Sequence, residues 1–213
     1  MNYTTIFFDL DETLYPPSSG LWDAIKERIQ LYMHERLDIP WKDIPRLRRT
    51  YFEQYGTTLR GLEANYAVNQ DDYLAYVHNL VLTDYIGPDQ ELRAVLERLP
   101  VRKFVFTNAD AAHASRVLHV LQVDDCFDGI VDVHSMQPFC KPQPDAFIQA
   151  LRIAGEDDPH HCALVDDRPG TTSAARALGF FSILFGPPGS SPDADATLNH
   201  WRDLPVLLDG RKL

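Results

Sequence analysis

The chain has 213 residues and a normal apolar content of 45%, which suits one sizeable domain or a domain with an insert. A formal net charge of -11 argues against binding to nucleic acid polymers, because such binding depends on Lys and Arg that neutralise phosphates. Three cysteines without a C-x-x-C pattern predict reduced thiols in a cytoplasmic protein, and the lack of an apolar stretch near the ~18 residues of a membrane span predicts no membrane contact. We expect a monomer or a homodimer.

The first predicted element is a short apolar strand, residues 6–8, that ends in two carboxylates, Asp9 and Asp11. In an extended backbone, positions i and i+2 point the same way, so both carboxylates are expected to project from the carboxyl end of this strand. Two neighbouring carboxylates favour a divalent cation such as Mg²⁺. Asp9 could then attack an electrophile while Asp11 transfers a proton. Alternatively, both are solvated residues that close a strand, and Thr13 caps a helix.

Between residues 15 and 88 the apolar residues recur at helical spacing, and no convincing strand is present, so we expect an insert of three to five helices. One break interrupts this pattern at Gly56, Thr57, Thr58 and Arg60. It is either an ordinary turn between helices or a loop that contacts substrate, since Arg60 can meet a phosphate or a base oxygen.

From residue 88 onward, strand and helix patterns alternate, with expected strands at 101–106, 127–133, 162–165 and 180–185. This alternation predicts an α/β fold with a doubly wound parallel sheet, to which residues 1–14 add the first strand. We therefore expect an α/β core of residues 1–14 and 89–213, and a helical insert of residues 15–88.

Polar residues follow two further expected strands. Thr107 and Asn108 come directly before a helix, where they could bind phosphate or merely cap the helix. Asp166 and Asp167 end the strand at 162–165 and suggest metal ligation. Adjacent side chains in a strand face opposite ways, so we expect Asp167 to bind the metal directly and Asp166 through water.

Lys141 lies in a loop between Cys140 and Pro142, and Pro142 and Pro144 restrict the backbone there. A loop lysine is often only a solvated charge. At this place in the chain, Lys141 is one of few cations that could neutralise both a phosphate and the Asp9 carboxylate.

These four ordered motifs, namely Asp9 with Asp11, Thr107 with Asn108, Lys141, and Asp166 with Asp167, resemble those of the haloacid dehalogenase-like phosphohydrolases. The resemblance implies that Asp9 is the nucleophile, Asp11 the general acid/base, and the helical insert a cap that selects substrate. Further stretches are similar to the pyrimidine 5′-nucleotidase branch of that family: residues 7–16, 55–62, 106–109, 113–118 and 127–130. One departure stands out, because Arg168 and Thr171 occupy positions where that branch usually has Ser and Asn.

The resemblance implies a Mg²⁺-dependent phosphomonoesterase that acts through an aspartyl-phosphate. Its expected substrate is a small phosphate monoester, and the pyrimidine nucleotides UMP and CMP are the first candidates. A sugar-phosphate phosphatase or a phosphomutase of the same family are alternatives. A dehalogenase is disfavoured, because that chemistry needs neither Asp11 nor a metal. The alternative outside enzymes is a binding module without catalysis, in which loss of Asp9 or Lys141 would be expected.

Overall fold

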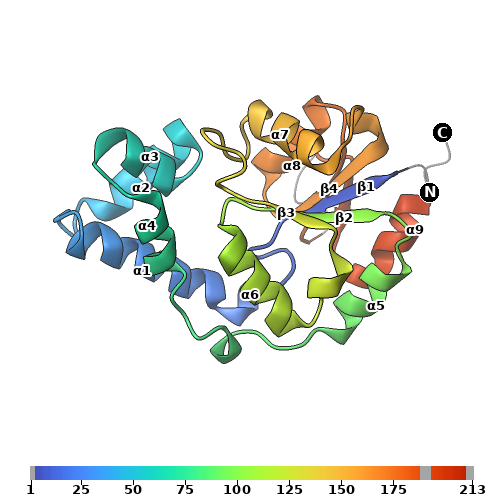
Figure 1. Ribbon diagram of the computed structural model, residues 1–213, viewed down its shortest axis with the longest axis horizontal. Helices are drawn as coiled ribbons and strands as arrows, with labels where there is room; N and C mark the ends of the chain where they lie inside the picture. The colour runs from blue at the N-terminus through green and yellow to red at the C-terminus, as the bar shows by residue number, and fades with distance from the viewer. Residues whose placement is uncertain (1–2, 188–192, 210–213) are drawn as a thin grey trace. The chain divides into compact units, whose positions relative to one another are not determined.

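The computed structural model describes residues 3–187 and 193–209. The chain forms two compact units (Figure 1). The core unit comprises Met1–Pro16 and Ile86–Leu213, and the helical unit comprises Pro17–Tyr85. The boundaries expected from sequence, after residues 14 and 88, differ from these by no more than about three residues.

The core unit is built on a six-stranded sheet in the order β3-β2-β1-β4-β5-β6, and every neighbouring pair is parallel. This confirms the predicted fold class. Its strands are β1 Thr5–Phe8, β2 Arg102–Phe106, β3 Gly129–Val131, β4 Cys162–Asp166, β5 Phe181–Phe185 and β6 Ala196–Leu198. The chain order reverses on either side of β1, and a crevice for ligands opens at the carboxyl ends of the strands at such a point.

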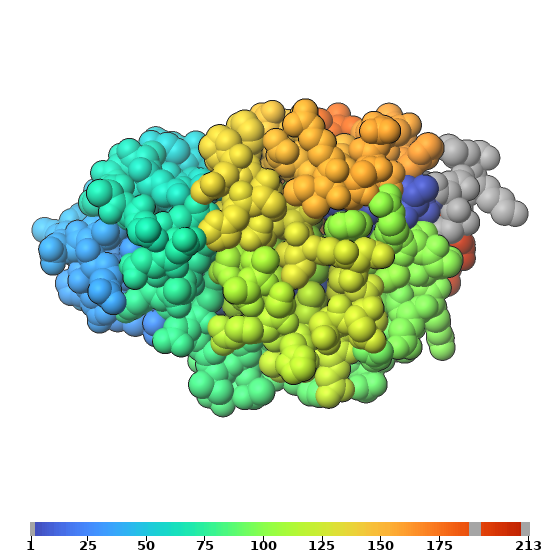
Figure 2. Space-filling model, in the orientation of Figure 1, coloured from blue at the N-terminus to red at the C-terminus, as the bar shows by residue number. Residues whose placement is uncertain are grey.

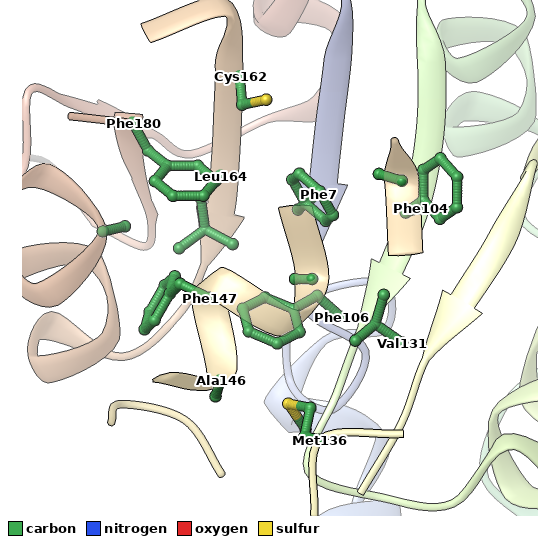
Figure 3. Close-up of a cluster of buried hydrophobic side chains, with 13 residues drawn as sticks. Phe7, Phe104, Phe106, Val131, Met136, Ala146, Phe147, Cys162, Leu164 and Phe180 are labelled. Carbon is green, nitrogen blue, oxygen red and sulfur yellow. The ribbon is translucent and has the colours of Figure 1, made fainter. Parts of the chain in front are cut away.

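Both faces of the sheet are covered, which explains why β1 consists only of buried residues. On one face, α7 (Pro144–Ala154) and α8 (Pro169–Ala177) pack over an aromatic cluster in which Phe7 and Phe147 converge on Phe106 (Figure 3). The Phe106 and Phe147 rings meet edge to face, with centroids 5.3 Å apart. Phe8 points to the opposite face and contacts Phe127 and Trp201.

That opposite face is covered by α5 (Gln90–Arg98), α6 (Ala111–Leu121) and α9 (Leu204–Asp209) (Figure 1). In the space-filling view, side chains of the covering helices and loops hide most of the central strands (Figure 2). The sheet is therefore a rigid base, and only the residues beyond its strand ends are positioned to meet a ligand.

The structure adds two elements that the sequence analysis did not assign, β6 and α9. β6 pairs with β5 at the sheet edge, and Trp201 stacks on Phe185 with ring centroids 4.5 Å apart. The third strand is also shorter than predicted, because only Gly129–Val131 pairs with β2.

The helical unit contains α1 (Leu21–Glu35), α2 (Ile44–Tyr55), α3 (Thr58–Asn65) and α4 (Gln70–Val77), and none of its residues forms a strand. Tyr32 of α1 packs edge to face on Tyr73 of α4, with ring centroids 5.0 Å apart. The prediction of an all-helical insert after the first strand is confirmed. Across residues 3–187 and 193–209, no helix combines the length and the apolar character needed to cross a membrane.

Candidate active site

Asp9 lies directly beyond the carboxyl end of β1, where its N–H donates to the carbonyl of Val165 at 2.9 Å. The chain then turns, because the Leu14 N–H donates to the carbonyl of Leu10 at 3.0 Å and Glu12 adopts a φ of 60°. The extended backbone expected through Asp11 is therefore not found, although Asp11 is close enough for its charge to raise the pKa of Asp9. The strand ends at Phe8, and Asp11 lies in the turn.

Lys141 links the ends of β1 and β4. Its Nζ donates to Asp9 Oδ1 at 2.6 Å and to Asp166 Oδ2 at 2.8 Å, and its side chain is 4% exposed. Burial disfavours the ammonium, but Asp166 and Asp9 outweigh that effect and raise the pKa of Lys141, so it stays charged. The Phe106 ring, whose centroid is 5.2 Å from Nζ, adds a cation–π contact.

Asn108 fixes the backbone of Lys141. Its carboxamide donates to the Lys141 carbonyl at 3.0 Å and accepts from the Lys141 N–H at 2.9 Å. Asn108 follows β2, so this pair of hydrogen bonds connects the loop that carries Lys141 to the sheet. The lysine is thus held by its backbone as well as by its charge.

Three carboxylates, those of Asp9, Asp166 and Asp167, each offer an oxygen within 4.8 Å of the others. Asp166 is fully buried, and its Oδ1 accepts from the Arg168 N–H at 2.9 Å. The Asp167 N–H donates to Thr13 Oγ1 at 3.1 Å, so Thr13 braces this cluster. Asp167 Oδ1 is buried and has no hydrogen-bond partner among the residues that the structure describes.

Burial, with the neighbouring negative charges, raises the pKa of two of the three carboxyl groups. Burial raises the pKa of Asp9 well above its usual value, and Asp166, Asp167 and Asp11 add to the effect while Lys141 opposes it. Burial, followed by the charge of Asp166, raises the pKa of Asp167 to about 6. Without a further cation, the cluster is an energetically unfavourable arrangement.

A hard divalent cation fits this donor set, because Mg²⁺ prefers oxygen ligands and is held by few carboxylates. The buried Asp167 Oδ1 would gain a partner in such a site. Asp166 already accepts hydrogen bonds at both oxygens, whereas Asp167 does not, which favours the prediction that Asp167 binds directly.

Asp11 does not belong to this cluster of three carboxylates. Its Oδ1 accepts a hydrogen bond from the Tyr15 hydroxyl at 2.6 Å, and His113 Nε2 lies 3.7 Å from the same oxygen. Burial and the neighbouring Asp11 raise the pKa of Tyr15, so its hydroxyl keeps the proton and donates. Neither Tyr15 nor His113 was predicted to have a chemical role. The one signal for Tyr15 is its position four residues after Asp11.

Thr107 and Asn108, predicted to bind phosphate, lie at the same end of the sheet. Thr107 is buried, and its Oγ1 accepts from the Ala109 N–H at 3.0 Å. The following helix α6 offers fewer N–H donors than expected, because Asp132 accepts from Ala111 and Asp110 accepts from His113. Phosphate binding by Thr107 and Asn108 stays a prediction.

The residues predicted to select substrate lie where α2 meets α3 in the helical unit. Gly56 ends α2 with a φ of 86°, and the Thr57 side chain caps α3 by accepting from the Arg60 N–H at 3.1 Å. The Arg60 guanidinium is buried and pairs with Glu63 at 2.9 Å. Thr57 and Arg60 thus have structural roles here, and their part in substrate choice stays a prediction.

The two departures from the nucleotidase pattern have different surroundings. Arg168 is exposed at the start of α8, and its charge partly offsets the effects that raise the pKa of Asp167. Thr171 is buried in the first turn of the same helix, where its N–H donates to the Arg168 carbonyl at 3.0 Å.

Residues 3–179 match the model of the haloacid dehalogenase-like hydrolase family. Among curated proteins, the chain is similar to phosphate metabolism protein 8 of Saccharomyces cerevisiae, with 29% identity over 194 residues. The match covers 84% of this chain and 60% of that protein, so the chain spans under two thirds of this relative's length.

Among solved structures, the chain resembles a HAD phosphatase from Thermococcus onnurineus, with a TM-score of 0.66, 14% identity and coverage of 99% of this chain and 100% of that one. It also resembles the HAD-hydrolase YfnB from Bacillus subtilis bound to magnesium, with a TM-score of 0.62, 14% identity and coverage of 97% and 99%. At such identities the likeness shows the fold alone.

Proposed function

The chain belongs to the haloacid dehalogenase-like hydrolases, and from that premise we propose that it hydrolyses a small phosphate monoester through a phosphoryl group carried on Asp9. The observation that carries this proposal is the buried cation of Lys141 between Asp9 and Asp166, next to a carboxylate oxygen of Asp167 without a hydrogen-bond partner in the described part of the chain. The three carboxylates outnumber the one ammonium, so the site favours a divalent cation, and that cation together with Lys141 would offset the charge of a bound phosphate.

In the proposed reaction, an Asp9 oxygen forms a bond to phosphorus while the bond from phosphorus to the leaving oxygen breaks. Asp11 gives its proton to that leaving oxygen. Asp11 then takes a proton from the water that attacks phosphorus, and the acyl phosphate on Asp9 is cleaved to the free carboxylate and inorganic phosphate. Lys141 holds the Asp9 carboxylate in place and offsets the charge of the phosphoryl oxygens.

A Mg²⁺ ion held by Asp9, Asp166 and Asp167 would supply further positive charge to the phosphoryl oxygens. Uncatalysed phosphate monoester hydrolysis is among the slowest reactions, with enzymatic accelerations of up to ~10²¹-fold. This demand accounts for the presence of a nucleophile, an acid and several cationic groups at one place.

For the substrate, we favour a pyrimidine nucleoside 5′-monophosphate, UMP or CMP, on the basis of the sequence similarity to that branch. Gly56, Thr57, Thr58 and Arg60 are the proposed specificity residues. Because Arg60 pairs with Glu63, Gly56 and Thr58 are the better candidates for direct contact in this segment. A sugar phosphate is the alternative substrate, and phosphoryl transfer between sugar positions is the alternative reaction.

The test is phosphate release from UMP, CMP, AMP, GMP and sugar phosphates, with Mg²⁺ and with a chelator. Wild type is compared with Asp9→Asn, and with Asp124→Asn as a control at an exposed carboxylate outside the cluster. We expect release led by UMP or CMP that requires the metal, is abolished in Asp9→Asn and is unchanged in Asp124→Asn.

Release from sugar phosphates alone would keep the mechanism and overturn the substrate. Conversion of one sugar phosphate to another without release would identify a phosphomutase. Equal turnover by wild type and Asp9→Asn would overturn the proposed mechanism, because Asp9 would then not carry the phosphoryl group. No turnover of any compound would overturn the proposed function and favour a binding module.

A further inference from the structure

The Asp11 carboxylate is held by a second side chain from its own turn. The Tyr15 hydroxyl donates to Asp11 Oδ1 at 2.6 Å, a short hydrogen bond of the strong, charge-assisted kind. We propose that Tyr15 is a positioning residue that orients Asp11 for proton transfer to the leaving group. This inference rests on the proposed function, in which Asp11 is the general acid.

The local backbone explains how Tyr15 reaches Asp11. The turn closed by Leu10 and Leu14 brings residues four apart in the chain next to each other. The positive φ of Glu12 lets the chain fold back within these few residues. Tyr15 itself is 1% exposed, so its ring is fixed by packing and its hydroxyl has a defined position.

A second buried ring limits the movement of Asp11 from another side. His113 lies on α6, its side chain is fully buried, and its Nε2 is 3.7 Å from Asp11 Oδ1. The terminal torsion of an aspartate is soft, so a carboxylate without such neighbours samples a broad range of orientations. Tyr15 and His113 come from different elements, and together they restrict one oxygen of Asp11.

The hydrogen bond also favours the direction of proton transfer in the first step. As the O–H bond of Asp11 breaks and the leaving oxygen gains the proton, Asp11 becomes a carboxylate. A hydrogen bond to a carboxylate is roughly twice as strong as one to a neutral acid, so Tyr15 stabilises Asp11 as its charge develops. The Tyr15 hydroxyl keeps its own proton throughout.

The effect should depend on the leaving group, because a poor leaving group needs the proton and a good one does not. For Tyr15→Phe, we expect kcat with an alkyl phosphate, such as the nucleotide found to be the best substrate, to fall by about tenfold, the equivalent of about 1.4 kcal/mol. For 4-nitrophenyl phosphate we expect a loss of less than about twofold. KM should change little for either, since Tyr15 contacts Asp11 and not the substrate.

The control is Tyr32→Phe, which removes a buried hydroxyl that donates to the Asp72 carboxylate at 3.1 Å in the helical unit. It is expected to leave both rates unchanged. A second variant carries 3-fluorotyrosine in place of Tyr15, keeps the hydroxyl, and is expected to retain the wild-type ratio of the two rates. This variant provides the test should Tyr15→Phe fail to fold.

Equal losses for both substrates in Tyr15→Phe, or no loss for either, would overturn the inference. A ratio in the 3-fluorotyrosine variant that differs from the wild-type ratio would also overturn it, whether or not Tyr15→Phe folds, because this variant keeps the hydroxyl. Failure of the proposed function has a different signature, namely that wild type is inactive or that Asp11→Asn retains full turnover of the alkyl phosphate.

Discussion

The ionised form of Asp9, which the proposed reaction needs, is also the form that burial disfavours in the folded protein. Asp9 is buried among other carboxylates, and its pKa is raised for that reason. Lys141 is the cation that offsets them. The ionised carboxylate of Asp9, the proposed nucleophile, therefore destabilises the fold, and Lys141 offsets part of that effect.

In the absence of metal, neutralising Asp9 and neutralising Lys141 should have different effects on the free energy of unfolding. Asp9→Asn removes a carboxylate that folding disfavours in its ionised form, so we expect the free energy of unfolding to stay unchanged or to rise. Lys141→Met leaves buried carboxylates without their cation and should lower it by about 3 kcal/mol. Urea denaturation in chelator measures both, and an equal loss in the two variants would contradict this account.

The residues of the candidate site were predictable to the extent that strand ends position them. Asp9 and Asp167 follow buried strands and Asp166 is the last residue of one, and the carboxyl ends of parallel strands meet at one edge, so their proximity could be inferred. The contact between Tyr15 and Asp11 could not, because it depends on the turn that Glu12 permits. The structural roles of Asn108 and Arg60 could likewise not be predicted from the sequence, since both depend on tertiary hydrogen bonds.

Among the elements, α2 and α3 of the helical unit approach each other closely at Gly61. A Cβ added at Gly61 would lie 2.2 Å from Tyr51 Cγ and 2.3 Å from Tyr51 Cβ. These atoms are near the backbone of α2, so the tyrosine cannot move away by a simple rotation of its ring. Glycine is therefore needed inside α3 despite its low helix propensity.

Gly61→Ala should destabilise the helical unit by about 1–3 kcal/mol, because overpacking outweighs the gain of up to ~1 kcal/mol in helix propensity. Gly87→Ala is the matched control, since an added Cβ there meets nothing within 4 Å. Thermal unfolding followed by circular dichroism measures the effect. A Gly61→Ala protein as stable as the Gly87→Ala protein would show that α2 and α3 can separate without penalty.

Long periodic elements were predicted well and short ones poorly. The strands β1, β2, β4 and β5 and the helices between them were apparent from apolar runs and alternation. The strand β6 has three residues, Ala196–Leu198, and α9 has six, so neither contains enough residues to show a period. Their place depends on the sheet edge and on Trp201, which are tertiary features.

For the whole molecule, the acidic cluster makes stability depend on both pH and bound metal. In the metal-free protein the pKa of Asp167 is about 6, above its usual value. The folded state then binds more protons than the unfolded state between about pH 4 and 6, so this group lowers stability as pH rises through that window. A bound cation has the opposite effect on the pH dependence of stability, because it binds the carboxylate in its ionised form.

We therefore expect saturating Mg²⁺ to raise the melting temperature at pH 7, and this increment to shrink as the pH falls below about 6. The measurement is thermal unfolding at several pH values, with Mg²⁺ and with a chelator. Asp167→Asn is the comparison, and it should lose most of the increment at pH 7. An increment that stays constant between pH 7 and 5 would contradict the assignment of this cluster to a metal.

The central position of β1 in the sheet also determines the order in which the chain can fold as it leaves the ribosome. β1 is synthesised first, yet its partner strands begin only at Arg102 and Cys162. The helical unit ends at Tyr85, so its whole chain is available to bury apolar residues before either partner of β1 exists. The first strand therefore lacks one neighbour until β2 has emerged and the other until β4 has emerged, so the candidate site at its carboxyl end cannot be complete before Asp167 has been synthesised.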